Sequence, residues 1–354
     1  MITTWKEIAT QAGRFLGKSH DVIGVDVGSR FMKSVKLQVD RSCPILKTFE
    51  IGTVASNTYY DSQSSREKDK SLSQIIQQNQ LTPVPHTVGI SVSGPQVLLK
   101  PLSLPVMTEN DLREHLTLEL DRYIPFDVQD VVWDIYHPKV PVKEGKQEHF
   151  LVMAKKEFIK NQIQQFEQEG MKVSFVDVDT FALANMVAYN YGNEGTWFIV
   201  HLGPTGILSV MIQEGIPVHI RQVSYEAEWY GELLDRVLIS HEMTDGGCKL
   251  GASEMLLLQQ FIQETTSQIF GFIKHFSVIS GKAVVSAVLL SGGYSMVGGL
   301  TEKLADQLQI PVGLVNPFKE IAVPLAIQQD VRFQKVSPLL GVAVGVALRG
   351  VVSS

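Results

Sequence analysis

The feature that most constrains the fold of this chain is a strand–turn–strand unit that occurs twice. In the first copy, Val25-Asp26-Val27-Gly28 ends an alternating apolar strand, and a second strand follows at Phe31–Leu37. In the second copy, Val200-His201-Leu202-Gly203 repeats the pattern 175 residues later, and a strand follows at Ile207–Ile212. Two similar units in two lobes predict a duplicated fold with a ligand between its halves. The offset is the size of a domain, whereas a solenoid repeats at much shorter periods.

The first unit carries a carboxylate beside a tight turn. Asp26 precedes Gly28 and Ser29, so backbone N–H groups of the turn can approach a phosphate while the acid holds Mg²⁺ directly or through water. The simpler interpretation is a solvated aspartate in an ordinary hairpin. The second copy of the unit favours the functional interpretation. Lys33 is a further candidate for phosphate, although Lys33 and Lys36 also suit a solvated strand edge.

A third turn follows a late apolar strand. Val284–Leu290 ends in Ser291-Gly292-Gly293-Tyr294, and a helix with Leu300, Leu304 and Leu308 on one face comes next. Glycines let a backbone lie against a flat base or ribose, and the start of a helix favours negative charge. The turn is not a Walker A loop, because no Gly-Lys-Ser/Thr is present. The predicted nucleotide contacts beyond the first hairpin are Gly203, Thr205, Gly206, Gly292, Gly293 and Tyr294.

The length of 354 residues predicts at least two lobes. We expect an N-terminal extension at residues 1–20 and a first lobe at 21–94 and 173–195. A small β-α-β-β-α module at 95–172 is inserted into that lobe, and a second lobe covers 196–336. A C-terminal helix at 337–350 is expected to pack back on the first lobe.

Composition excludes several classes of function. The net charge of −6 argues against nucleic-acid binding, which needs a basic surface. The two cysteines lie far apart and indicate neither a disulfide framework nor a metal site, which fits a reducing cytosol. We expect no signal peptide at the N-terminus, and the apolar run Val336–Leu348 is too short and glycine-rich to span a bilayer. Membrane association is therefore expected only through a partner.

The order of hairpin, hairpin and Gly-Gly turn resembles the actin, sugar kinase and Hsp70 superfamily. Within it, the chain is similar to the type IV pilus assembly protein PilM family, which is related to FtsA. The segments that carry this resemblance are Gly24–Ser29, Leu104-Pro105, Tyr123-Ile124-Pro125-Phe126, Val176–Asp179, Leu290–Gly293, Val315-Asn316-Pro317-Phe318 and Gly341–Arg349. Tyr-Ile-Pro-Phe and Asn-Pro-Phe together separate PilM from other actin-like families.

The resemblance implies an α/β, actin-like, two-lobed duplicated fold with an FtsA-type inserted subdomain. It implies ATP with Mg²⁺ in the cleft between the lobes, with Asp26 as the metal anchor. It also implies a role in type IV pilus biogenesis, as a cytoplasmic scaffold that is peripheral at the inner membrane. The implied partner is the cytoplasmic N-terminal peptide of a PilN-like inner-membrane protein, held in a groove beside the inserted module. Contacts with other pilus platform proteins and motor ATPases, and a homo-oligomer or ring, stay open.

The sequence departs from the family pattern in the second hairpin. His201 stands where the family usually carries an aspartate, and a neutral imidazole is a poor Mg²⁺ ligand. The simpler interpretation of His201 is a packed strand histidine. The segment Tyr225–Gly251 also lacks the Glu-x-x-x-Lys pattern that grips ribose and base in FtsA and PilM. We therefore expect a scaffold without ATP hydrolysis. The alternatives are an active actin-like ATPase or kinase, and an FtsA-like cell-division or filament protein.

Overall fold

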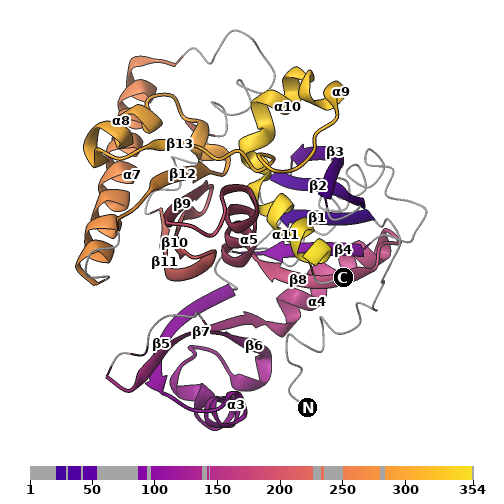
Figure 1. Cartoon of the computed structure of the whole chain (residues 1–354), viewed down its shortest axis with the longest axis vertical. Helices are drawn as coiled ribbons and strands as arrows, with labels where there is room; N and C mark the ends of the chain where they lie inside the picture. Colours follow the sequence, from indigo (N-terminus) through magenta and orange to yellow (C-terminus); the bar gives the residue numbers. More distant parts are fainter. Residues whose placement is uncertain are drawn as a thin grey trace.

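The computed structural model describes residues 21–28, 31–40, 43–53, 87–93, 97–137, 142, 144–225, 233–234, 250–279 and 284–352. The described strands form two five-stranded sheets and one three-stranded sheet. Figure 1 shows the three-stranded sheet at the bottom of the view, below the two larger sheets. The predicted N-terminal extension and Ser29 lie outside the described residues.

The first sheet has the strand order β3-β2-β1-β4-β8. Its strands are β1 (Asp21–Val27), β2 (Phe31–Asp40), β3 (Cys43–Thr53), β4 (Thr87–Val92) and β8 (Val173–Val178). Strand β1 runs antiparallel to β2 and parallel to β4. Val22 packs into one hydrophobic cluster, whereas Ile23 and Val25 pack into another. Both faces of β1 are therefore covered, which explains why it is buried almost throughout.

The second sheet repeats this arrangement with the order β11-β10-β9-β12-β13. Its strands are β9 (Thr196–Gly203), β10 (Gly206–Gln213), β11 (Ile216–Ser224), β12 (Ala287–Ser291) and β13 (Val312–Leu314). Asp26 of β1 lies opposite Ser91 of the parallel neighbour β4. In the same way, His201 of β9 lies opposite Ser291 of the parallel neighbour β12. The strand register therefore makes His201 the counterpart of Asp26.

The C-terminal helix α11 (Gly341–Val352) packs against β1 and against helix α5 (Asp179–Tyr191). A side chain at Gly24 would collide with the carbonyl oxygen of Ala343, and one at Gly345 would collide with that of Ala182. These two contacts explain why glycine stands in the middle of a buried strand and in the interior of a helix.

The helical stretch Val331–Val351 is long and apolar enough to cross a membrane. It is longer than the run predicted from the sequence, because α10 (Val331–Val336) and the 3₁₀ helix η4 (Ser337–Leu340) lead directly into α11. The protein itself buries 72% of the apolar 18-residue window within this stretch. A helix covered to this extent is a core element.

Helices α7 (Ala252–Ile279) and α8 (Leu300–Leu308) contribute to the core of the second sheet. Phe261 and Phe272 of α7 and Leu304 of α8 are buried against Phe198 and Val288 of that sheet. The short 3₁₀ helix η3 (Gly293–Met296) follows β12, and Tyr294 in it is fully buried. A further described helix of this region is α9 (Leu325–Gln328).

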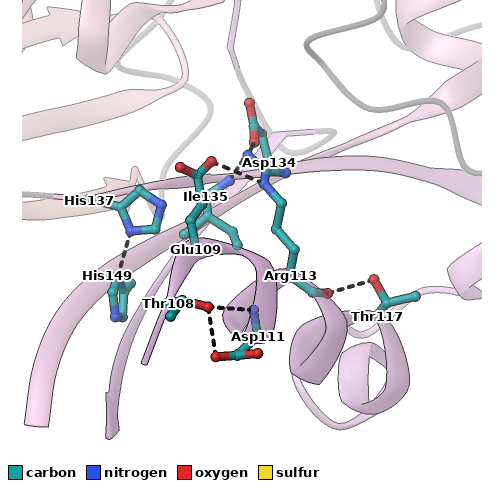
Figure 2. Close-up of polar contacts among 9 residues, drawn as sticks. All are labelled: Thr108, Glu109, Asp111, Arg113, Thr117, Asp134, Ile135, His137 and His149. Carbon is teal, nitrogen blue, oxygen red and sulfur yellow. Dashed lines mark hydrogen bonds and ion pairs between the residues drawn. The ribbon is translucent and has the colours of Figure 1, made fainter. Parts of the chain in front are cut away.

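The third sheet has the order β5-β7-β6 and carries helix α3 on one face. Its elements are β5 (Val97–Pro105), α3 (Glu109–Glu119), η1 (Leu120–Arg122), η2 (Val128–Asp130), β6 (Val131–Tyr136) and β7 (Lys146–Lys155). Thr108 caps α3 by accepting a hydrogen bond from the Asp111 backbone N–H, as Figure 2 shows. Leu112 and Leu116 of α3 then pack against Trp133 and Leu151 of the sheet.

Helix α4 (Lys156–Gln168) follows the third sheet. Its residues Ile159 and Phe166 pack with Ile23, Val25 and Ile90 of the first sheet. The predicted module boundary at residue 172 assigns α4 to the inserted module, and the cluster that buries α4 also includes Val132 and Val152 of the third sheet. The boundaries of lobes and module stay predictions.

Candidate functional site

A small polar cleft lies where the two similar hairpins, β1–β2 and β9–β10, approach each other. Its cavity has a volume of about 80 Å³. The predicted site residues that line it are Asp26, Gly28, Lys33, Gly203, Thr205, Gly206, Gly293 and Tyr294. Gly292 is not among the lining residues. A side chain on Gly292 would collide with Leu202 of β9, so this glycine keeps the turn against the sheet.

The cleft contains a buried ion pair between the two strands of the first hairpin. Lys33 Nζ donates to Asp26 Oδ2 at 2.7 Å, and the two residues are 6% and 2% exposed. They lie directly opposite each other in the β1–β2 ladder. A solvated strand edge, the simpler interpretation of Lys33, is therefore wrong. Lys36 instead pairs with Asp21 at 2.8 Å, nearer the surface.

Asp179 adds a second acid to the cleft, and the sequence did not single it out as a site residue. It follows β8 and is the first residue of α5. Its Oδ1 is buried and has no hydrogen-bond partner within the described part of the chain. Burial, reinforced by the negative charge of Asp26, raises the pKa of Asp179 to about 7. Near neutral pH this acid is therefore partly protonated.

His201 lines the same cleft from the second hairpin. Its Nδ1 is buried without a hydrogen-bond partner among the residues that the structure describes. Burial lowers the pKa of His201 to about 4, the charge of Asp26 opposes this shift, and the charge of Lys33 adds to it. The imidazole is therefore neutral at physiological pH. The net charge of the cleft is set by Asp26, Lys33 and Asp179.

The residues of the cleft do not fit Mg²⁺. The described residues contain no group of three or more His, Cys, Asp or Glu side chains placed to hold a metal ion. The Asp26 carboxylate pairs with Lys33, and a neutral imidazole such as His201 is a poor ligand for this ion. For a ligand as large as a nucleotide, the cavity of about 80 Å³ is small, because pockets for small molecules typically measure roughly 300–1,000 Å³. Lys33 and the turn Gly203–Gly206 are the groups suited to a phosphate.

A much larger groove lies beside the third sheet. Its volume is about 790 Å³. The lining comes from β6, β7 and β8, from α5, from the β10–β11 turn and from the end of α11. Apolar side chains make most of it: Ile135, Val152, Val176, Val178, Phe181, Ala184, Ala188, Pro217 and Leu348. Both β6 and β8 are edge strands of their described sheets, so the groove lies between two sheet edges.

Two ion pairs set the polar character of this groove. Arg113 reaches from α3 to Asp134 of β6 at 2.7 Å, as Figure 2 shows, and Asp134 lines the groove. Arg349 of α11 reaches Asp177 of β8, also at 2.7 Å, and both residues line the groove. The four charges therefore balance in pairs along the groove wall.

The sequence of this chain matches one protein family over most of its length. The family model described as "Type IV pilus assembly protein PilM" matches residues 24–351. The chain belongs to this family. The match includes the first hairpin, the third sheet, the second lobe and nearly all of α11, which confirms the family resemblance stated from the sequence.

Solved structures show the fold of this PilM-family chain. A structure described as the "PilM-PilN type IV pilus biogenesis complex" is 22% identical, with a TM-score of 0.73 over 93% of this chain and 98% of the other. The predicted actin-like fold is thereby confirmed. The ethanolamine utilization protein EutJ from Carboxydothermus hydrogenoformans is 11% identical, with a TM-score of 0.48 over 97% and 94% of the chains. No argument rests on that weaker likeness.

The structure brings together most of the predicted cleft residues and adds others that the sequence did not identify. Asp179 in the cleft, and Asp177 with Arg349 in the groove, are the main additions. The available signal was Val176-Asp177-Val178-Asp179, where two acids alternate with valines at a strand–helix junction. In one continuous strand these two acids would share a face, because they are two positions apart. Strand β8 ends at Val178 and Asp179 begins α5, so Asp177 lines the groove and Asp179 lines the cleft.

Proposed function

We propose that this protein is a cytoplasmic scaffold of the type IV pilus assembly platform, located at the inner membrane through its partner. The partner is the cytoplasmic N-terminal peptide of a PilN-like protein, and the groove of about 790 Å³ is its binding site. Membership of the PilM family and the likeness to a PilM-PilN complex support this proposal.

The groove is the observation that carries the proposal. Its volume lies in the range of pockets that bury a compact ligand, and its wall is mainly apolar. In the described sheets, β6 pairs only with β7 and β8 pairs only with β4. An extended peptide can therefore use main-chain hydrogen bonds of a free strand edge while its apolar side chains fill the groove.

The cleft has a structural role in this proposal. Its buried Asp26–Lys33 pair ties the two strands of the first hairpin together where they face the second hairpin. ATP stays a prediction from the resemblance, with Lys33 and the turn Gly203–Gly206 as the phosphate-binding groups. No hydrolytic step is proposed, because the donor set does not suit the metal. The predicted contacts with other platform proteins and motor ATPases, and a homo-oligomer or ring, also stay predictions.

Peptide binding tests the proposal directly. The full chain is titrated into a fluorescent peptide that copies the cytoplasmic N-terminus of a PilN-like protein, and anisotropy is measured. We expect saturable binding that Asn185→Trp weakens at least 50-fold, because Asn185 lines the groove and a large ring would fill it. Lys160→Trp places the same ring on the exposed side of α4 and is expected to leave binding unchanged. Equal loss in both variants, or no binding by the unaltered chain, would sink the proposal.

A further inference from the structure

One carboxylate oxygen in the groove has no hydrogen-bond partner among the residues that the structure describes. Asp177 is 1% exposed and lines the groove. Its Oδ1 accepts hydrogen bonds from the Val178 backbone N–H at 2.8 Å and from Arg349 Nη1 at 2.7 Å. Its Oδ2 is buried and has no hydrogen-bond partner among the described residues. The acid is therefore only half satisfied within the described fold.

A buried acceptor without a donor is unusual in folded proteins. Nearly all buried polar groups are hydrogen-bonded, and leaving one unmade is costly because the group has lost its water. Where such an atom belongs to a side chain that lines a large groove, a ligand can supply the missing donor. The position of Asp177 in the groove wall therefore points to the occupant of the groove.

The charge balance of the groove restricts what that donor can be. Arg349 neutralises Asp177, and Arg113 neutralises Asp134. The charge of Asp177 raises the pKa of Arg349, burial opposes this shift, and Asp134 adds to the rise. The guanidinium thus stays charged and close to both acids. A lysine or arginine of a ligand would meet acids that are already paired with Arg349 and Arg113. An uncharged N–H group requires no opposite charge.

Arg349 also offers donors beside the unmet acceptor. Its side chain is 41% exposed, and its Nη1 pairs with Asp177 Oδ1. A guanidinium carries five N–H groups, so several remain for a ligand oxygen. An amide is the neutral group that donates and accepts side by side. Its N–H suits the free oxygen of Asp177, and its carbonyl suits the guanidinium of Arg349.

We infer that Asp177 and Arg349 form an acceptor–donor pair that binds one uncharged amide of the segment occupying the groove. The inference rests on the proposed function, because the occupant is taken to be the partner peptide. It adds that the peptide docks with a neutral amide at this point, in the main chain or in a side-chain carboxamide. The apolar lining then takes the flanking residues.

A pair of matched protein variants tests the inference with the same fluorescent peptide. Asp177→Asn keeps one oxygen for the Val178 N–H and Arg349 but replaces the other by an NH₂ group, so we expect at least tenfold weaker binding. Asp134→Asn removes a groove carboxylate whose Oδ1 already accepts from Arg113 and from the Ile135 backbone N–H. For that variant we expect at most a threefold change. Thermal melting establishes that both variants fold.

A peptide series identifies the amide. Each backbone N–H is methylated in turn, and each side-chain carboxamide is replaced by an apolar isostere. One position should cost at least tenfold with the unaltered chain and at most twofold with Asp177→Asn. If the peptide binds but no position costs tenfold, or Asp177→Asn binds within threefold of the unaltered chain, the inference is overturned while the proposed function stands. If the unaltered chain does not bind the peptide, the proposed function fails first. If Asp177→Asn does not fold, the peptide series on the unaltered chain decides alone.

Discussion

The cleft and the groove meet at one strand–helix junction, and they differ in volume and in how their charged groups are paired. Val178 lines both, yet the cleft has a volume of about 80 Å³ and the groove about 790 Å³. In the cleft, Lys33 neutralises Asp26 internally, and burial holds Asp179 partly protonated. In the groove, the wall is apolar and one buried acceptor is left unmet. The cleft is therefore organised to stabilise the fold, and the groove to receive a ligand.

The two hairpins explain how the cleft reached this state. Asp26 pairs with Lys33 across β1 and β2, and His201 pairs with Leu208 at the corresponding position of β9 and β10. The second hairpin thus has neither the acid nor the amine. A single buried charge without a partner would be costly, and the second hairpin contains none at this position. The duplicated fold has kept the shape of the turn in both halves and the charge in only one.

The largest effect is expected from breaking the charge pair of the cleft. Asp26→Asn leaves Lys33 buried beside a neutral amide, so the free energy of unfolding should fall by about 3–5 kcal/mol. Asp21→Asn removes the more exposed pair with Lys36 in the same hairpin and should cost about 1 kcal/mol or less. Urea denaturation measures both. Equal losses, or a loss of peptide affinity in folded Asp26→Asn, would contradict the division between cleft and groove.

The second acid of the cleft gives a smaller, pH-dependent effect. The pKa of Asp179 is raised to about 7, so the folded state holds its proton more tightly than the unfolded chain. Its contribution to stability is therefore fully present below about pH 4 and is lost as pH rises towards 7. Asp179→Asn mimics the protonated acid. Its stability relative to the unaltered chain should be greater at pH 8 than at pH 5, by about 1–3 kcal/mol.

The exposed Asp130→Asn is the matched control for this comparison. Thermal melting of both variants at the two pH values gives the measurement. A stability difference for Asp179→Asn that does not change with pH would show that Asp179 is not held protonated by the cleft.

The smallest effect concerns the inserted sheet that supplies β6 to the groove. Figure 2 shows the rings of His137 and His149, whose Nδ1 atoms lie 3.0 Å apart. Burial and the neighbouring His137 lower the pKa of His149, and the charge of Glu148 opposes the shift. The folded state therefore resists protonation. Stability from His149 is fully present above about pH 6.5 and is lost as pH falls below it.

Replacing this histidine isolates its share of the acid sensitivity. His149→Gln should lose less stability than the unaltered chain between pH 6.5 and 5, as measured by thermal melting. His115→Gln, on the rim of α3, is the control and should keep the original slope. An unchanged slope in His149→Gln would show that burial does not hold His149 neutral in the folded sheet.

The strands and the duplication were predictable because they depend on local patterns. Alternating apolar residues in Val22–Val27 and Phe198–Leu202 identified the paired hairpins, and the glycines identified their turns. The family followed from short segments such as Tyr123-Ile124-Pro125-Phe126. Each of these patterns involves residues close together in the sequence, so it can be recognised without the structure.

The charge states and the groove were not predictable from such patterns. Lys33 resembled a solvated strand residue. The alternation of polar and apolar residues in its strand does not reveal that the second lobe lies against this hairpin. Asp177 and Arg349 are 172 positions apart and meet only because α11 packs against the first sheet. The groove is formed by β6, β8 and α5 together, so no single stretch of the sequence predicts it.

The central claim is that the groove, and not the cleft, is the working site of this PilM-family protein. One calorimetric comparison tests it most directly. The full chain is titrated with the PilN-like N-terminal peptide and, separately, with ATP and Mg²⁺, and ATP turnover is followed in the same samples. The account predicts saturable peptide binding that does not require Mg²⁺, and no ATP turnover. ATP turnover that Asp26→Ala abolishes, in a chain that does not bind the peptide, would contradict it.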